Sequence, residues 1–250
     1  MTAMADEFTG KATVYDKARP GYSPAALDFV LESITPPCRC GDIPPHGGGQ
    51  GLVIADIGAG TGKFCAMLCA RGCDVIAVEP NADMRSKLPV LPNLRVMDGT
   101  AEATGLPDHS VDAVTCAQAF HWFDGEKFKA ECLRILKPGG RIFVVYNNPG
   151  PDYKRHDELI WHNPNSGSGW LAREERLRGF FGPEMRREVF PNPVSYDAQG
   201  WLAYMLSHSH SPRPGDEVYE RFLESVRLIF ERSNENGRLH MQFETTVYTA

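Results

Sequence analysis

The residues best suited to chemistry lie in a glycine-rich segment, Asp56-Ile57-Gly58-Ala59-Gly60-Thr61-Gly62. A run of apolar residues (52–57) precedes it, and a helical pattern begins at Thr61. Glycine adopts backbone angles that other residues resist, so such a turn lets a ligand come close to the main chain. The segment predicts either a ligand-binding turn between a strand and a helix or a tight turn that binds nothing.

The spacing of the glycines argues against two common nucleotide-binding loops. A dinucleotide-binding turn needs glycines at its first, third and sixth positions, and here the sixth position is Lys63. No Gly-Lys-Ser/Thr follows at the spacing of a phosphate-binding P-loop. The pattern therefore disfavours a nicotinamide or flavin enzyme, and no Tyr-x-x-x-Lys pair follows Tyr146 or Tyr153 to support one.

Further polar residues follow the next predicted strands. The carboxylate of Glu79 suits a pair of ribose hydroxyls, and Asp98 or a neighbouring amide suits an adenine edge. The carboxyl ends of parallel strands meet at one edge of a sheet, where open α/β sheets bind ligands. The candidate cofactor-binding residues of this edge are Asp56, Gly58, Ala59, Gly60, Gly62, Glu79, Pro80, Asp98, Gly99, Thr100, Ala101, Glu102, Gln118, Ala119, His121 and Trp122.

Alternating elements position these residues. Strands are predicted over 52–57, 74–78, 94–97, 111–117 and 141–146, with helices over 61–71, after Asn81 and from Asp124 to Leu136. A helix is predicted from Pro24 to Ile34, and a surface loop over 35–51. An irregular, partly helical stretch (148–182), a strand (185–190), helices (197–207 and 216–231) and a last strand (239–248) follow. This order implies a parallel α/β sheet with right-handed crossovers.

Composition is that of one globular domain spanning 1–250, with 42% hydrophobic and 23% charged residues. The net charge is −6, and no Lys/Arg cluster stands out, so nucleic acid is not an expected partner. No apolar run is long enough for a membrane span, and residues 1–10 lack the features of a signal peptide, which predicts a cytoplasmic protein. The seven cysteines form no disulfide framework, and Cys38 and Cys40 have only His46 nearby, so we expect no metal site.

The motifs together resemble a class I S-adenosylmethionine-dependent methyltransferase, of the group called the type 11 methyltransferase domain. The resemblance rests on Asp56 to Gly62, Glu79, Asp98 and the turn Leu136-Lys137-Pro138-Gly139-Gly140, and covers 50–147, the expected cofactor-binding core. Ala117 to Phe123 and Arg19-Pro20-Gly21-Tyr22 are similar to the trans-aconitate methyltransferase-like subgroup, which suggests small acids or lipophilic metabolites as acceptors.

The resemblance implies a Rossmann-like, seven-stranded sheet whose last strand (239–249) is antiparallel, with helices on both faces. Residues 148–231 would include a small helical lid over the acceptor site. Residues 1–34 would cover the cofactor S-adenosyl-L-methionine through Tyr15, Arg19 and Tyr22, with Arg19 either on the methionine carboxylate or simply on the surface.

The expected reaction is in-line attack on the methyl group by a small-molecule acceptor. We favour an oxygen acceptor, carboxylate or hydroxyl, over nitrogen, sulfur or carbon. His121 is the candidate general base, with packing or cofactor contact as alternatives. Cys116, inside a strand, is expected to be core and not a nucleophile, and a non-catalytic binder on the same fold remains the alternative function. The oligomeric state has no signal in the sequence.

Overall fold

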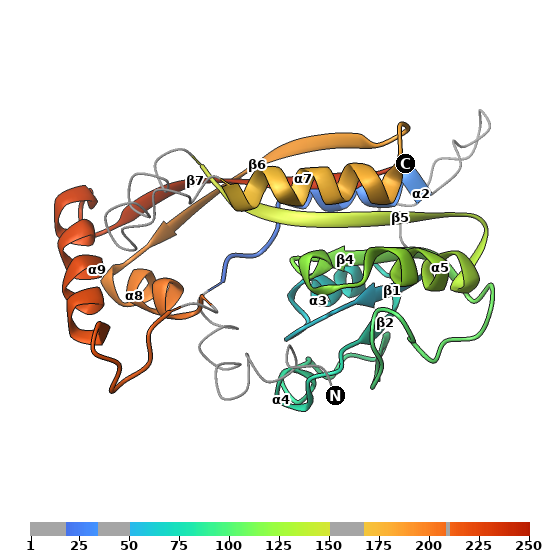
Figure 1. The fold of residues 1–250 in the computed structure, drawn as a ribbon, viewed down its shortest axis with the longest axis horizontal. Helices are drawn as coiled ribbons and strands as arrows, with labels where there is room; N and C mark the ends of the chain where they lie inside the picture. The colour runs from blue at the N-terminus through green and yellow to red at the C-terminus, as the bar shows by residue number, and fades with distance from the viewer. Residues whose placement is uncertain (1–18, 35–50, 151–167, 209–210) are drawn as a thin grey trace.

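A seven-stranded mixed sheet runs through the molecule in the order β3-β2-β1-β4-β5-β7-β6 (Figure 1). The computed structural model describes residues 19–34, 51–150, 168–208 and 211–250. The first five strands are parallel, and β7 runs antiparallel to both β5 and β6. The strands are β1 (Val53–Ile57), β2 (Asp74–Val78), β3 (Leu94–Met97), β4 (Val111–Ala117), β5 (Leu136–Pro149), β6 (Arg186–Tyr196) and β7 (Leu239–Thr249). The predicted sheet, with its antiparallel last strand, is confirmed.

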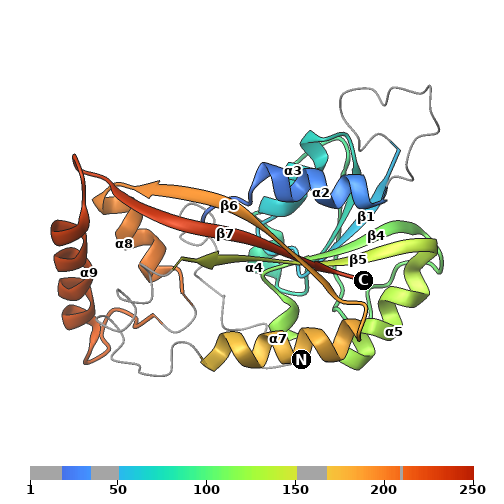
Figure 2. The ribbon, with the colours of Figure 1, turned by 90° about the horizontal axis from the view of Figure 1, so that it is seen from above.

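Helices cover both faces of this sheet. Figure 2 shows α2 and α3 on one face, with α5 and α7 on the other. The helices are α2 (Pro24–Ile34), α3 (Lys63–Ala70), α4 (Ala82–Arg85), the short 3-10 turn η1 (Phe120–Trp122), α5 (Gly125–Ile135), α7 (Ser168–Phe181), α8 (Ala198–Leu206) and α9 (Tyr219–Ser233). Within the described ranges, no helix is long and apolar enough to cross a lipid bilayer.

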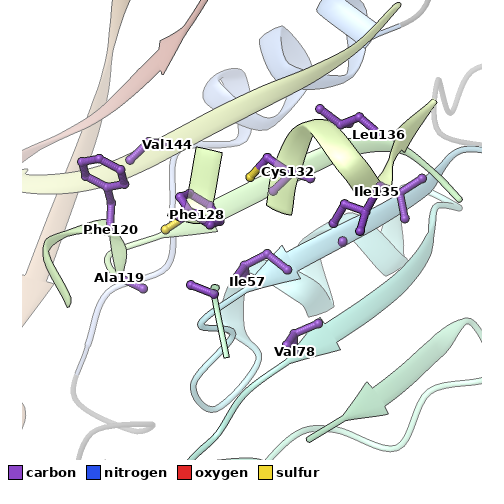
Figure 3. Packing of buried hydrophobic residues seen from close by; sticks show 14 of the residues in the cluster. Ile57, Val78, Ala119, Phe120, Phe128, Cys132, Ile135, Leu136 and Val144 are labelled. Atoms are coloured by element: carbon purple, nitrogen blue, oxygen red, sulfur yellow. The ribbon is translucent and has the colours of Figure 1, made fainter. Parts of the chain in front are cut away.

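The two-sided burial of the strands divides the core in two. In β1, Ile57 belongs to the cluster under α5 and α7, whereas Ile54 belongs to the cluster under α2 and α3. Successive side chains of a strand point to opposite faces, so an almost continuous apolar run fills both layers. Figure 3 shows part of the first cluster, to which Phe120 and Phe128 belong together with Val144 of β5 and Ile57 of β1.

Capping residues begin two helices where the sequence predicts them. The Asn81 side chain accepts a hydrogen bond from the Met84 amide, and the Asp124 side chain accepts one from Lys127. The helix predicted over 61–71 is shorter, because the left-handed Gly62 is its N-cap and α3 begins only at Lys63.

The fifth strand starts earlier than the predicted 141. Leu136 pairs with Val111, but the next pair joins Arg141 to Ala113, so the four residues between them bulge out of the ladder. Gly139 has φ +81°, and a Cβ on Gly140 would lie 2.9 Å from the Asp112 carbonyl oxygen. The Pro-Gly-Gly segment therefore kinks this strand and does not precede it.

The last third of the chain is more regular than the sequence suggests. The stretch predicted to be irregular and only partly helical contains the 14-residue α7, and the strand predicted over 185–190 continues to Tyr196. That strand contains Pro191 and Pro193, which are tolerated because β6 is an edge strand with only β7 as neighbour. At the far end of β6 and β7, α8 and α9 form a third apolar cluster around Trp201, which lies apart from the main layers in both views (Figures 1 and 2).

Candidate functional site

The glycine turn at the end of β1 stays bonded to β2. The amides of Gly58 and Ala59 donate to the Val78 carbonyl oxygen at 2.9 and 3.2 Å, and the Gly62 amide donates to the Ala59 oxygen at 2.9 Å. Gly58, Gly60 and Gly62 have φ values of +69°, +58° and +85°. All three occupy the left-handed region, which side chains resist.

The three glycines are needed for different reasons. A Cβ on Gly58 would lie 2.6 Å from Ala119 Cβ, and one on Gly62 would lie 2.5 Å from Leu88 Cδ2. A Cβ on Gly60 would meet nothing within 4 Å. Thus Gly58 and Gly62 permit close packing inside the protein, and only Gly60 faces open space that a ligand can enter.

Glu79 closes the turn from the β2 side. Its Oε2 accepts from the Gly60 amide at 2.9 Å, and its Oε1 accepts from the Asn81 amide at 2.9 Å. Burial raises the pKa of this carboxyl, whereas the two amides and the Arg85 charge act in the opposite direction. Each oxygen has a second lone pair, so the carboxylate can still accept from a ligand's hydroxyls.

Asp98, which follows β3, lies on the surface and is already paired. Arg85 Nη1 and Nη2 lie 3.0 and 3.1 Å from its two oxygens. Arg85 also donates to the carbonyl oxygens of Glu79 and Pro80, both at 2.8 Å. The arginine therefore ties α4 to the ends of β2 and β3, and it occupies the carboxylate that we expected near adenine.

The segment after Asp98 forms a tight turn. The Thr100 amide donates to the Ala103 carbonyl oxygen at 3.1 Å, and a Cβ on Gly99 would lie 2.8 Å from the Thr104 oxygen. Ala101 is buried, and Glu102 accepts a hydrogen bond from the Asp124 amide at 3.0 Å. These residues shape the edge beside β3, and the Glu102 carboxylate is used to join this turn to the start of α5.

The end of β4 carries backbone strain. Gln118 has φ +57°, its amide donates to the Val145 oxygen, and its side chain donates to the Asn147 oxygen, both at 2.9 Å. Ala119 is buried against the glycine turn. A non-glycine residue in this region costs energy, which neighbouring contacts must offset, and such residues cluster at functional sites.

His121 follows directly in η1. His121 is accessible to solvent, and its Nδ1 lies 3.5 Å from the Tyr146 hydroxyl. The His121 ring centroid lies 4.8 Å from the ring centroid of the partly buried Trp122. Removal from water on its inner side lowers the pKa of His121 to about 4, and the charges of Arg173, Arg176 and Arg19 act in the same direction. The imidazole is therefore neutral at physiological pH and can accept a proton or a hydrogen bond.

A buried polar network holds the N-terminal segment over this edge. Asn147 donates to the Gly21 carbonyl oxygen at 2.8 Å and accepts from the Thr245 hydroxyl at 2.6 Å. The Ser23 amide donates to the same hydroxyl at 2.9 Å. The start of α2 is thus fastened to β5 and β7.

Comparison with known proteins identifies the family. A family model described as a methyltransferase domain matches residues 55–144. The uncharacterized methyltransferase Rv3342 of Mycobacterium tuberculosis is 33% identical over 252 residues, covering 94% of this chain and 91% of the relative. The chain belongs to the methyltransferase family. A relative in Schizosaccharomyces pombe, the uncharacterized methyltransferase C25B8.09, is 25% identical over 94% of this chain and 93% of its own length.

Solved structures share this methyltransferase's fold. A structure described as a type II methyltransferase from Anaeromyxobacter dehalogenans matches with a TM-score of 0.63 and 24% identity, covering 93% of this chain and 97% of that one. A methyltransferase assigned to an antibiotic biosynthesis pathway of Anabaena variabilis has a TM-score of 0.64 and 22% identity, covering 94% and 99%. At this identity they support the class I fold alone, and the trans-aconitate subgroup stays a prediction.

The cofactor of the methyltransferase is S-adenosylmethionine, and the residues present fit it. Gly60 leaves its side open for the methionine part of the molecule, and the Glu79 carboxylate beside it suits the ribose hydroxyls. When bound, the cofactor supplies an electrophilic methyl group on a sulfonium.

Other candidates of the sequence lie elsewhere in the methyltransferase. Asp56 is buried, with its oxygens accepting from Thr115 Oγ1 at 2.7 Å and Cys65 Sγ at 3.0 Å, so it joins β1 to β4 and α3. Burial raises its pKa to about 6. Cys116 is fully buried with a raised thiol pKa, which confirms a core role.

Of the three N-terminal candidates, Arg19 and Tyr22 lie among the described residues. Tyr15 lies outside the described residues, as do Cys38 and Cys40. Tyr22 is buried with its ring 5.0 Å from Phe64, and Arg19 points toward α8, where it contacts the Ser207 carbonyl oxygen at 3.4 Å and lies over the Tyr204 ring. The predicted contact of Arg19 with the methionine carboxylate stays a prediction.

Sequence reasoning missed several residues at this edge. Asn147 was not among the predicted site residues, although a polar residue directly after the strand predicted over 141–146 is a signal in itself. Arg173 and Arg176 are three residues apart, so they share one face of α7. A helix predicted over 168–181 would have placed the two arginines together. The role of Arg85 has no local signal, because its partners come from two strands.

Proposed function

We propose that this methyltransferase transfers a methyl group from S-adenosylmethionine to a small-molecule acceptor, at a carboxylate or hydroxyl oxygen. The observation that carries the proposal is the contact between Glu79 and the Gly60 amide, beside the only glycine of the turn that faces open space. The same proposal places the reaction in the cytoplasm, with no nucleic acid as substrate.

The chain's own residues act by positioning. An acceptor held in line behind the methyl carbon gains about 7–11 kcal/mol from proximity and alignment. A carboxylate acceptor is already ionised and needs no base. A hydroxyl acceptor would donate its proton to the one ring nitrogen of His121 that carries no hydrogen in the neutral imidazole.

The surrounding elements would complete the site. We assign residues 1–34 to the cofactor side, because the Asn147 network fastens the start of α2 to the sheet edge. We assign residues 148–231 to the acceptor side, because α7 places Arg173 over the Tyr146 ring at 4.2 Å. Excluding water from such a site strengthens its electrostatic interactions.

The test is titration of S-adenosylhomocysteine into the wild-type protein and the Glu79→Gln variant. Glu79→Gln should weaken binding at least tenfold, because the amide group replaces one acceptor oxygen with a donor facing a backbone amide. Glu126→Gln, in the first turn of α5, is the control and should bind as the wild type does. Equal affinity in both folded variants would refute the site, and tighter binding of NADH would refute the cofactor.

Catalysis is tested separately from binding. Release of S-adenosylhomocysteine during incubation with a mixture of small carboxylic acids and alcohols should exceed release in buffer alone. A protein that binds the cofactor but never turns over with any acceptor would instead be a non-catalytic binder.

A further inference from the structure

A guanidinium with no carboxylate partner among the described residues lies next to the proposed acceptor site. Arg173, on α7, is partly buried and stacks over the Tyr146 ring, with 4.2 Å between its Cζ and the ring centroid. Its Nη2 donates to Asn148 Oδ1 at 2.7 Å. Among the residues that the structure describes, it forms no salt bridge, and its neighbour Glu174 pairs with Arg178 instead.

The surroundings of Arg173 are short of hydrogen bonds. Within the described part of the chain, its Nε is buried without a hydrogen-bond partner. The same holds for the buried Tyr248 hydroxyl, which interacts with Arg173 electrostatically. The Arg173 side chain is only partly buried, and its Nη1 donates to no group among the described residues. A partly buried cation normally has an anion beside it, because removal from water disfavours the charge.

Arg173 is also connected to the candidate base. The ring on which it stacks carries the hydroxyl that lies 3.5 Å from His121 Nδ1. Arg176, one turn further along α7, donates to the carbonyl oxygens of His121 and Phe123 at 3.0 and 2.9 Å. Those two bonds occupy Arg176 and fasten α7 to η1, so of these two arginines Arg173 is the one able to face a ligand beside His121.

We propose that Arg173 binds a carboxylate of the methyl acceptor, so that the substrate of this enzyme is an organic acid. Nη1 and the positive charge supply the attraction, while Asn148 and the Tyr146 ring hold the guanidinium plane in place. With Nη2 already engaged, one guanidinium matches the single charge of a carboxylate better than the double charge of a phosphate. The proposal rests on the proposed methyl transfer.

The experiment measures binding to the protein saturated with S-adenosylhomocysteine. The probes are malonate, succinate, glutarate and benzoate, with neutral succinamide and inorganic phosphate for comparison. At least one carboxylate should bind tighter than succinamide and phosphate, and Arg173→Gln should weaken that binding tenfold or more. Arg178→Gln, on the same helix but exposed and paired with Glu174, should stay within twofold of the wild type.

A second variant covers the case in which Arg173→Gln does not fold. Arg173→Lys keeps the charge but loses the planar fork, so it should weaken carboxylate binding about threefold or more while retaining the fold. Carboxylate binding unchanged in the folded variants, no carboxylate preference over succinamide, or a preference for phosphate would each overturn the proposal. Failure of the proposed function is seen separately, as absent S-adenosylhomocysteine binding by the wild type.

Discussion

Alanine substitutions at Gly58 and Gly60 should separate two roles of the glycine turn, close packing inside the protein and access for a ligand. Both glycines have positive φ, so alanine costs about 1–2 kcal/mol at either position. At Gly58 the new Cβ would also lie 2.6 Å from Ala119 Cβ and 2.9 Å from Phe123 Cζ. Overpacking of this kind adds about 1–3 kcal/mol. Gly58→Ala should therefore lower the free energy of unfolding by about 2–5 kcal/mol and Gly60→Ala by about 1–2 kcal/mol.

Cofactor affinity should show the reverse order. The Cβ of Gly60→Ala would occupy the open side of the turn, so its affinity for S-adenosylhomocysteine should fall at least tenfold, more than that of folded Gly58→Ala. Urea denaturation and calorimetric titration measure the two quantities. Gly179→Ala in α7, where a Cβ meets nothing within 4 Å, is the control and should be neutral or stabilising. Equal destabilisation by Gly58→Ala and Gly60→Ala would refute the packing argument, and equal affinities would refute the open side at Gly60.

Three further predictions concern the polar side chains of Asp56, His121 and Asn147. Burial raises the pKa of Asp56 from 3.8 to about 6, so between these pH values the folded state holds a proton that the unfolded state releases. The free energy of unfolding should therefore fall by about 3 kcal/mol as pH rises from 4 to 6. Urea denaturation of Asp56→Asn should show this pH dependence removed, and a dependence equal to that of the wild type would contradict the assignment. If His121 is the base for a hydroxyl acceptor, His121→Ala should lower turnover while leaving S-adenosylhomocysteine affinity within twofold. Wild-type turnover should then decline only as pH falls through about 4, so a break near 6.5 would contradict the lowered pKa. Asn147→Ala should lower the free energy of unfolding by about 1–3 kcal/mol, because the Gly21 carbonyl and the Thr245 hydroxyl lose a buried partner. Asn192→Ala removes a more exposed donor to the same carbonyl, so urea denaturation should show a smaller loss in the free energy of unfolding.

The local features of this chain could be predicted because their causes are local. Asp74–Val78, Leu94–Met97 and Val111–Ala117 were predicted with their observed bounds, since short runs rich in apolar residues between turn residues form strands. Asn81 and Asp124 begin helices because each side chain reaches an amide three residues ahead. The glycine turn could be recognised for the same reason, since φ is a property of single residues.

The reasons for the glycines could not be predicted in the same way. Gly58 and Gly62 approach Ala119 and Leu88, which belong to other parts of the chain, so sequence spacing alone made all three glycines resemble ligand contacts. Asp56 illustrates the same limit, because its partners Thr115 and Cys65 come from β4 and α3. A carboxylate at the end of a strand looks alike in sequence whether it faces a ligand or the core.

The order of strands, helices and turns, and with it the edge where we propose that the cofactor binds, follows from the sequence by itself, because periodicity, caps and glycines act over a few residues. Only the tertiary structure decided which charged, polar and aromatic groups meet at that edge. Arg85 is paired with Asp98, Asn147 is bonded to Gly21, and Arg173 lies over Tyr146, each across a separation along the chain that no local pattern encodes. Such pairings depend on how the helices and strands pack in three dimensions, which sets both the distances between charges and their exposure to water.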